Sequence, residues 1–332
     1  RYVGPLTLTQ SDLQEPRCFP DEISHGGWPL DDHHPGGFTH PGNPNHNGPV
    51  RAPYGIPYRA LYSYNVENLF MAGRNISVTH IVLSSTRVMS TCALLGQAVG
   101  LAATLAVRHN LTPQQVYERQ RDRLRNLAQL VELYMPNYVR QPLELSRAAE
   151  LELNLSGETR AATADADVTP FRDPDLIRDG YDREVGDAVH GIDLVPGEAV
   201  TYKFPAPVDL RLIRIVWDSD LNRDSCSGHA GLKWLPMLCN RFTEGCVFGM
   251  PAIMARDFVV EYFCSDTCAE SGTEAGWQPF LDIKDNHRRL YLQDCDVRTD
   301  RLRLRLTATW GAPAARLISF EPGAQSVMEL LG

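Results

Sequence analysis

Residues 68–103 read NLFMAGRNISVTHIVLSSTRVMSTCALLGQAVGLAA and decide the fold of the first half of the chain. The opening apolar run ends in Gly73, which is typical of a short buried strand. After a polar connection, residues 89–108 are apolar, rich in Gly and Ala, and long enough for a buried helix. Free N–H groups and the helix dipole favour an anion at the N-terminus of such a helix, near Arg87. A tightly packed strand–helix unit that binds nothing is the alternative.

The flanking segments extend this picture in both directions. Thr112 is a good N-cap, Pro113 suits the first helical position and Gln115 completes a capping box, so a second helix is expected to run on to Leu130. Upstream, residues 1–57 are dense in Pro, Gly and His. Residues 31–49 in particular have the composition of a long irregular loop, and such loops are often functional.

Beyond residue 175 the pattern changes to short β-prone runs separated by turn residues. Residues 301–306 alternate Arg and Leu, which gives one buried and one solvent-facing side. Strands without intervening helices predict an antiparallel sandwich. The expected strands are 199–204, 210–217, 257–263, 288–293, 301–309 and 315–320.

Composition limits the function classes. The 332 residues suffice for two domains, and a net charge of −9 argues against a nucleic-acid-binding surface. The longest apolar run, 92–107, is interrupted by Gln97 and is shorter than the ~20 residues of a membrane span. Six of the eight cysteines fall between residues 226 and 295. Disulfides and free thiols both fit their spacing, and zinc is disfavoured because no Cys-x-x-Cys pair occurs.

Five sequence blocks follow one another in the first half: GGWPLDDH at 26–33, IPYRAL at 56–61, NLFMAGRNIS at 68–77, RVMSTC at 87–92 and GQAVGLAA at 96–103. In this order they resemble the FAD-dependent oxidoreductases with a glutathione-reductase-like flavin domain, whose members often carry a xanthan-lyase label. The resemblance implies that residues 58–135 are the C-terminal part of an FAD-binding α/β domain. Residues 1–57 would then be the tail of a substrate domain with a His/Gly/Pro-rich loop.

The resemblance also implies a set of cofactor-binding residues around the strand end and the small-residue helix. FAD is the expected cofactor, and the small-residue helix would aim its positive end at the flavin. The implied cofactor-binding residues are Gly73, Arg74, Asn75, Arg87, Thr91, Gly96 and Gln97. Tyr58 and Arg59 are expected to bind substrate, although an aromatic side chain and an arginine there equally fit packing and a surface ion pair.

Histidines supply the candidate catalytic groups. Flavin-dependent oxidation of an alcohol needs a base that takes a proton as hydride leaves, and neutral histidine suits this role at neutral pH. Position in the family-like block makes His33 the first candidate, followed by His80 and His34. One alternative is that these histidines belong to a polar loop that has no catalytic role. A metal site is the other, and it is disfavoured because no ligand spacing stands out.

One motif of the resembled family has no counterpart in this sequence. That family opens with the phosphate-binding motif G-x-G-x-x-G after a strand, and this sequence contains none. We therefore expect the other half of the flavin site on an N-terminal, glycine-motif-bearing half, either in the same polypeptide or on a separate chain. The present chain alone is expected not to hold FAD tightly.

The second half carries a different resemblance. LIRIVWD at 212–218, FVVEY at 258–262 and LRLR at 302–305 resemble strands of a discoidin-like β-sandwich. The expected fold class is thus α/β plus all-β, with a linker at 136–170 and the sandwich at 171–332. Discoidin-like modules often bind glycans through aromatic faces, but most tryptophans in strands are core residues.

These observations predict the C-terminal portion, or one subunit, of an FAD-dependent oxidoreductase. The reaction expected from the resemblance transfers hydride to flavin from a hydroxylated small molecule such as a carbohydrate. Two alternatives belong to other classes of function. The chain would be a carbohydrate-binding module in the first, and in the second a non-catalytic scaffold subunit that completes the flavin site of a partner.

Overall fold

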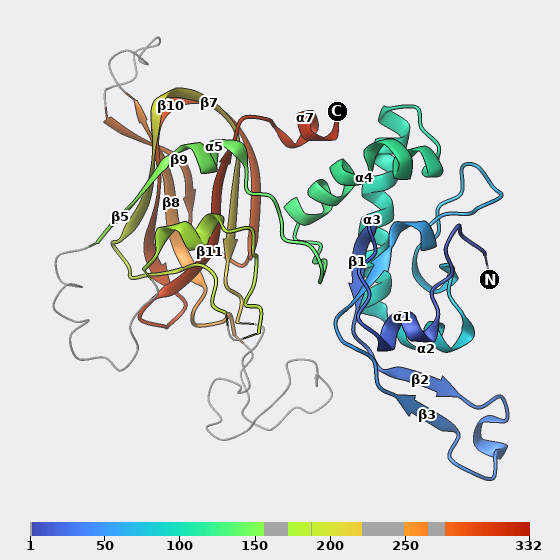
Figure 1. Cartoon of the computed structure of the whole chain (residues 1–332). Coiled ribbons are helices and arrows are strands. Elements are labelled where there is room, and N and C mark those ends of the chain that lie inside the picture. The colour runs from blue at the N-terminus through green and yellow to red at the C-terminus, as the bar shows by residue number, and fades with distance from the viewer. Residues whose placement is uncertain (1, 156–171, 187, 221–248, 265–275) are drawn as a thin grey trace. The chain divides into compact units, whose positions relative to one another are not determined.

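The computed structural model describes residues 2–155, 172–186, 188–220, 249–264 and 276–332. The chain divides into two compact units, each with its own hydrophobic core (Figure 1). The N-terminal unit comprises Arg1–Gln141 and Met328–Gly332, and the sandwich unit comprises Pro142–Val327. The boundaries expected at residues 57, 135 and 170 stay predictions.

The N-terminal unit mixes helices with short strand pairs. Its helices are α1 (Gln10–Gln14), α2 (His80–Thr86), α3 (Met89–Arg108) and α4 (Pro113–Leu130), with the short 3-10 helices η1 (Gly37–Thr39), η2 (Tyr58–Ala60) and η3 (Gly73–Asn75). Its strand pairs are β1 (Glu22–Gly26) with β4 (Tyr54–Pro57), and β2 (Leu30–His33) with β3 (Asn45–Gly48).

The two long helices confirm the sequence prediction. At the start of α4, Thr112 Oγ1 accepts a hydrogen bond from the Gln115 N–H at 3.2 Å. Gln115 Oε1 in turn accepts one from the Thr112 N–H at 2.9 Å, so the capping box forms as expected. Helix α3 buries Leu95, Ala98, Ala102 and Leu105 in the core of the unit. Among the helices described, α3 alone is long and apolar enough to cross a membrane, a property that core helices of globular proteins share.

Two sequence predictions in this unit were wrong. Residues 68–73 form no strand, because Phe70 makes only an isolated bridge with Tyr62 and the apolar run is held by local bonds such as Met71 N–H to Leu61 O at 2.7 Å. Residues 31–49 are not a wholly irregular loop, since β2 and β3 pair antiparallel across it. Figure 1 shows the resulting ribbon projecting from the remainder of the unit.

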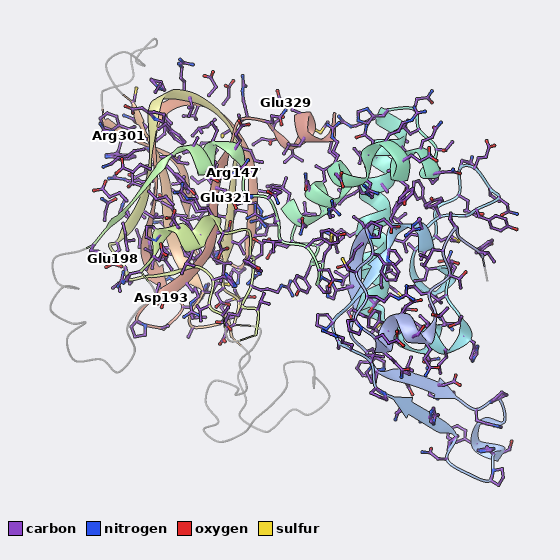
Figure 2. All side chains as sticks on the ribbon, in the orientation of Figure 1. Arg147, Asp193, Glu198, Arg301, Glu321 and Glu329 are labelled. Atoms are coloured by element: carbon purple, nitrogen blue, oxygen red, sulfur yellow. The ribbon has the colours of Figure 1, made fainter. Side chains whose placement is uncertain are left out.

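The last residues of the chain pack on the N-terminal unit. Helix α7 (Val327–Leu331) carries Glu329, which Figure 2 labels. Arg108 of α3 donates to the Met328 carbonyl at 3.3 Å, and Arg123 of α4 donates from Nε to the Leu330 carbonyl at 2.8 Å. The last carbonyls of a helix lack partners within it, so the Arg123 guanidinium satisfies that of Leu330, and both arginines hold α7 in place.

The sandwich unit contains one antiparallel sheet with the strand order β6-β11-β7-β10-β8-β9, and β5 pairs with β7. The strands are β5 (Glu150–Asn154), β6 (Ile192–Leu194), β7 (Ala199–Trp217), β8 (Ala255–Cys264), β9 (Gly276–Ile283), β10 (Leu290–Thr309) and β11 (Ala315–Gly323). These strands are accompanied by the short helices α5 (Glu144–Ala148) and η4 (Pro174–Arg178).

The sheet folds into two layers because β7 and β10 belong to both. The second half of β7 pairs with β11 and the first half of β10, whereas its first half pairs with β5 and the second half of β10. Bulges in β10 near residues 294–297 and 299–301 mark the change between the layers. Leu302, Leu304 and Leu306 are fully buried between them, which confirms the predicted alternation and the predicted antiparallel sandwich.

The structure differs from the expected strand boundaries in the sandwich. The runs 199–204 and 210–217 are one strand, and so are the runs 288–293 and 301–309. Pro205 and Pro207, which we interpreted as turn residues, lie exposed in β7 between its two paired halves, where no ladder N–H is required. Part of the expected linker is also structured, because the alternating sequence of β5 pairs with β7.

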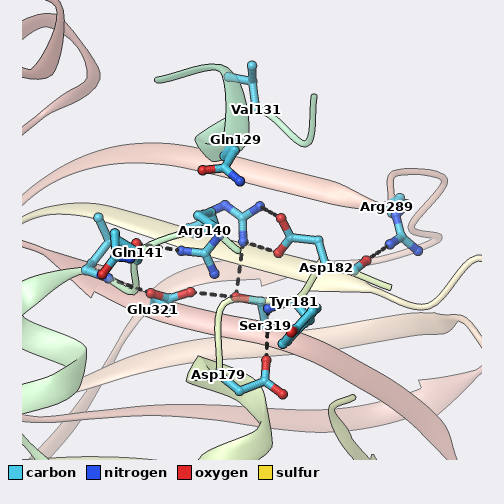
Figure 3. A network of polar contacts seen from close by, with 12 residues as sticks. Gln129, Val131, Arg140, Gln141, Asp179, Tyr181, Asp182, Arg289, Ser319 and Glu321 are labelled. Carbon is cyan, nitrogen blue, oxygen red and sulfur yellow. Dashed lines mark hydrogen bonds and ion pairs between the residues drawn. The ribbon is translucent and has the colours of Figure 1, made fainter. Parts of the chain in front are cut away.

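A buried polar network ties the segment before β6 to the sandwich (Figure 3). Arg214 is fully buried and forms a two-bonded ion pair with Asp182 at 2.8 and 2.7 Å. Arg214 also contacts Ser319 Oγ at 3.1 Å, and Ser319 donates to Glu321 at 2.9 Å. Glu321 accepts from the Leu143 N–H at 2.7 Å. Every charge in this network therefore has a partner, as buried charges require.

We expect Gly191→Ala to destabilise the sandwich unit by about 3 kcal/mol. Gly191 has a φ of +95°, and a Cβ there would lie 2.4 Å from the Leu317 carbonyl oxygen. Gly197 is the matched control, because its φ is +98° but no atom of the described residues lies within 4 Å of its Cβ position. Gly197→Ala should cost only about 1 kcal/mol. Urea unfolding followed by tryptophan fluorescence measures both, and equal costs would contradict the predicted clash.

We expect Glu22 to make the N-terminal unit less stable as the pH rises. Glu22 is 1% exposed, and burial raises its pKa above the ordinary 4.5 against the opposing hydrogen bonds from Asn137. The folded state then binds the proton more tightly than the unfolded chain does. The stabilising proton is fully bound below 4.5 and lost as the pH rises through the raised pKa.

The measurement is urea unfolding followed by helical circular dichroism at several pH values between about 4 and 8. Glu22→Gln should show a smaller loss of unfolding free energy across this range than the wild type. Glu15→Gln, at an exposed carboxylate, controls for the removal of charge alone. An identical pH dependence in the wild type and in Glu22→Gln would refute the prediction.

Candidate functional site

The 3-10 helix η3 faces the N-terminus of α3, and Gly73, Arg74 and Asn75, three of the expected cofactor residues, are here called the η3–α3 corner together with Cys92. Gly73 has a φ of +83°, a conformation that side chains rarely adopt, and its Cβ position lies 3.7 Å from Cys92 of α3. Helix α3 begins after Val88, which provides no side-chain cap. The first N–H groups of α3 therefore lack a side-chain partner at the N-cap, and the helix dipole adds positive potential there.

Polar groups at the η3–α3 corner fit a hydrogen-bonding anionic ligand. The Asn75 Oδ1 atom is buried and has no hydrogen-bond partner among the described residues. Arg74 is exposed beside it in the chain. Burial raises the pKa of the Cys92 thiol, and the charge of Arg74 opposes that rise. An unpartnered oxygen, a cation and an uncapped helix N-terminus together suit the hydroxyls and phosphates of FAD.

The other expected cofactor residues are distributed over three places. Thr91 is buried in the first turn of α3. Gly96 and Gln97 lie on the exposed side of α3, where Gln97 donates to the Val131 carbonyl at 3.3 Å. Arg87 instead reaches β2, donating to the Asp31 carbonyl at 3.0 Å. The η3–α3 corner thus unites only part of the set.

Two of the candidate histidines each lie beside a carboxylate of β2. His80 Nε2 lies 3.2 Å from Asp32 Oδ1, and His33 Nε2 lies 3.7 Å from Asp31 Oδ2. Arg87 also pairs with the Asp31 carboxylate at 3.7 Å. We name these five residues the β2–α2 cluster. His34 lies outside it at the turn of the ribbon, where it stacks on His40 at 3.7 Å.

Helix α2 fixes the position of β2. Ser84 Oγ accepts a hydrogen bond from the Asp31 N–H at 3.0 Å and donates one to the Ile81 carbonyl at 2.6 Å. With Arg87 bound to the Asp31 carbonyl, both backbone groups of Asp31 are held by α2. Sequence reasoning missed Asp31 and Asp32 as site residues, although both stand in the block that contains His33.

The expected substrate residues have structural partners. Tyr58 is 1% exposed, and its hydroxyl donates to the Pro113 carbonyl at 2.9 Å. Burial raises its pKa above the ordinary value. Arg59 forms a forked ion pair with Asp21 at 2.9 and 2.8 Å and lies over the ring of Tyr117. These contacts match the alternative of packing and an ion pair.

Two clefts lie in other parts of the molecule. A cleft of about 170 Å³ is lined by residues that include Arg17, Arg51 and Asn137, and one of about 140 Å³ by residues that include Arg183, Arg289 and Arg316. Neither includes a residue of the η3–α3 corner or the β2–α2 cluster.

Metal and cysteine chemistry can be assessed for the described residues alone. Over these residues, no group of three or more His, Cys, Asp or Glu side chains is placed to hold a metal ion. Cys18, Cys92 and Cys295 are free thiols. Four cysteines, at positions 226, 239, 246 and 268, lie outside the described residues.

Comparison with known proteins finds a family model that matches the first segment. Residues 1–129 match the model of the family described as FAD dependent oxidoreductase. The match covers all five sequence blocks and both candidate regions, and it confirms the resemblance over this segment. No curated protein matches the sequence.

Solved structures similar to the chain are carbohydrate-binding modules. The family 32 module of Streptococcus pneumoniae EndoD is 14% identical over 45% of this chain and 84% of its own, with a TM-score of 0.28. Chitosan-binding module 1 of a Paenibacillus sp. IK-5 chitosanase/glucanase is 11% identical over 54% and 96%, with a TM-score of 0.31. Clostridium perfringens CpGH89CBM32-6 is 12% identical over 55% and 97%, with a TM-score of 0.29. Scores this low support no argument about function.

We expect Tyr58→Phe to destabilise the N-terminal unit by about 1.5 kcal/mol, because it removes a buried hydrogen bond. Because the contacts of Tyr58 are structural, Tyr58→Phe should leave KM for substrate in the complete enzyme unchanged. Chemical unfolding gives the first quantity and steady-state kinetics the second. Tyr117→Phe, at a partly exposed ring, is the control, and a large rise in KM for Tyr58→Phe alone would instead place Tyr58 at the substrate.

Proposed function

We propose that this chain supplies part of the flavin site of an FAD-dependent oxidoreductase that transfers hydride from a hydroxylated substrate, such as a carbohydrate, to flavin. The family match over residues 1–129 carries this proposal. The η3–α3 corner supports it, because its uncapped helix end and the unpartnered Asn75 Oδ1 fit the polar part of FAD.

The residues of the η3–α3 corner would bind and orient the cofactor. FAD, when bound, accepts the hydride that leaves the substrate carbon. The first N–H groups of α3 and the Arg74 guanidinium would hold negative charge, and Asn75 Oδ1 would accept a hydrogen bond from a hydroxyl. Gly73 allows a close backbone approach because it carries no side chain.

The residues of the β2–α2 cluster would accept the proton of the substrate hydroxyl. His33 is the first candidate base, with the Asp31 carboxylate 3.7 Å from its Nε2 atom. A proton taken from the substrate hydroxyl would place a positive charge beside this carboxylate, which favours the transfer. His80, paired with Asp32, is the second candidate, and His34 at the turn of the ribbon is the third.

A glycine-motif-bearing half, in the same polypeptide or in a partner chain, would complete the site. One side of α3 is exposed, with Met89 at 90% and Val107 at 82%, and Gly96 and Gly100 lie between them with no neighbouring atom within 4 Å of their Cβ positions. An apolar, small-residue helix face permits close packing of another element. We propose that the glycine-motif-bearing half covers this face.

The first experiment is a visible absorption spectrum of natively purified protein, run beside a denaturing gel and an intact mass. A flavin band together with a longer polypeptide or a second chain is the expected result. A single colourless 37.1 kDa chain that remains colourless with added FAD would contradict the proposal for this form of the protein. Glycan binding by the sandwich unit would then be the function to test.

We expect Gly73→Val and Gly96→Trp each to lower the flavin content of the complete enzyme at least about tenfold. Gly73→Val places a β-branched residue at a φ of +83°, and Gly96→Trp obstructs the exposed face of α3. Gln114→Trp, at an exposed position of α4, is the control for a surface tryptophan. Flavin content measured by absorbance after denaturation decides the matter, and normal content in both variants would show that the cofactor binds elsewhere.

A further inference from the structure

We propose that Asn45 is a positioning residue that fixes the tautomer of His33, with the proton on Nδ1 and the lone pair on Nε2. The contact between Asn45 and His33 lies entirely within this chain. The catalytic role of the tautomer rests on the function proposed above, in which His33 accepts a proton from the substrate.

The ribbon places the two side chains opposite each other. His33 is the last residue of β2, and Asn45, the first residue of β3, is its direct partner in the antiparallel register. His33 Nδ1 lies 2.7 Å from Asn45 Oδ1. An amide oxygen accepts hydrogen bonds and donates none, so Nδ1 must carry the hydrogen. In a neutral ring the lone pair then resides on Nε2.

Asp31 stands on the other side of the ring. Asp31 and His33 are two residues apart on β2, and alternate residues of a strand share a face. The 3.7 Å between Nε2 and the Asp31 carboxylate exceeds a hydrogen bond but is short for an attraction between charges. The Asp31 backbone is held by Ser84 and Arg87, so this carboxylate is fixed in place before a proton arrives.

The contacts of the two ring nitrogens distinguish His33 from His80. In His80 it is the Nε2 atom that lies at 3.2 Å from a carboxylate, that of Asp32. In His33 the amide binds Nδ1, and Nε2 stays outside hydrogen-bond distance of Asp31. His33 is half exposed, with 48% of its side chain accessible. It therefore presents a basic nitrogen to an approaching hydroxyl group.

The chemical step balances with the reactants of the proposed function. The substrate O–H bond breaks and its proton goes to His33 Nε2, forming an N–H bond. Bound FAD would accept the C–H electron pair as hydride, and the substrate would become a carbonyl compound. Asn45 touches neither substrate nor flavin in this account, since it acts only through the imidazole.

The first test measures the tautomer by ¹⁵N NMR of the flavin-free chain, with His33→Gln used to assign the signals. The wild type and Asn45→Asp, which keeps an acceptor oxygen, should show the Nδ1–H form. Asn45→Val should lose this preference. Asn47→Val is the matched control, because Asn47 occupies the same strand opposite Asp31. An Nε2–H tautomer in the wild type, or no change in Asn45→Val, would overturn the proposal.

The second test uses the complete enzyme. Asn45→Val should lower kcat about tenfold or more with little change in KM, and Asn45→Asp should retain most of the activity. An unchanged kcat in Asn45→Val would overturn the catalytic purpose even if the tautomer shifts. The two proposals fail separately, because a protein without flavin activity contradicts the proposed function and leaves the NMR result standing.

Discussion

The candidate site depends on the hold of α2 on the backbone of Asp31. A ribbon of two short strands has little stability of its own in water. Here the Asp31 N–H and carbonyl are bound by Ser84 and Arg87, and Leu30 is buried at 2% exposure beside them. Because the antiparallel register is fixed from this point, the position of Asn45 opposite His33 follows. The chemistry of an exposed ribbon is thus set by contacts at its buried end.

The arrangement of the two layers in the sandwich unit depends on other contacts. Strands β7 and β10 run through both layers, so their bends and the buried leucines of β10 determine how the layers meet. The Arg214–Asp182 pair and Glu321 then attach the preceding segment to β11 and β7. Removal of one member would leave a buried charge without a partner, which costs more than the pair contributes. Stability of this unit and chemistry of the N-terminal unit therefore rest on separate residues.

The sequence predicted the elements whose signals are local. The capping box of Thr112 and Gln115 marked α4, and the Arg-Leu alternation of 301–306 marked a sandwich strand. The β2–β3 ribbon was missed because its strands are polar and are paired by backbone bonds between residues far apart in sequence. Asn45 became visible only through that pairing. Tyr58 shows the opposite difficulty, since its burial depends on a contact with Pro113 that no local pattern indicates.

The exposure of the candidate histidines supports a site that is completed by a second part. Hydride transfer to flavin works best where water is excluded, since competing reactions of the reduced cofactor are then suppressed. His33 and His80 are well exposed, with 48% and 69% of their side chains accessible. The apolar side of α3 adjoins the η3–α3 corner and is exposed as well. One covering element packed on α3 would account for both observations, because it would bury the helix face and close the surface over the cofactor residues.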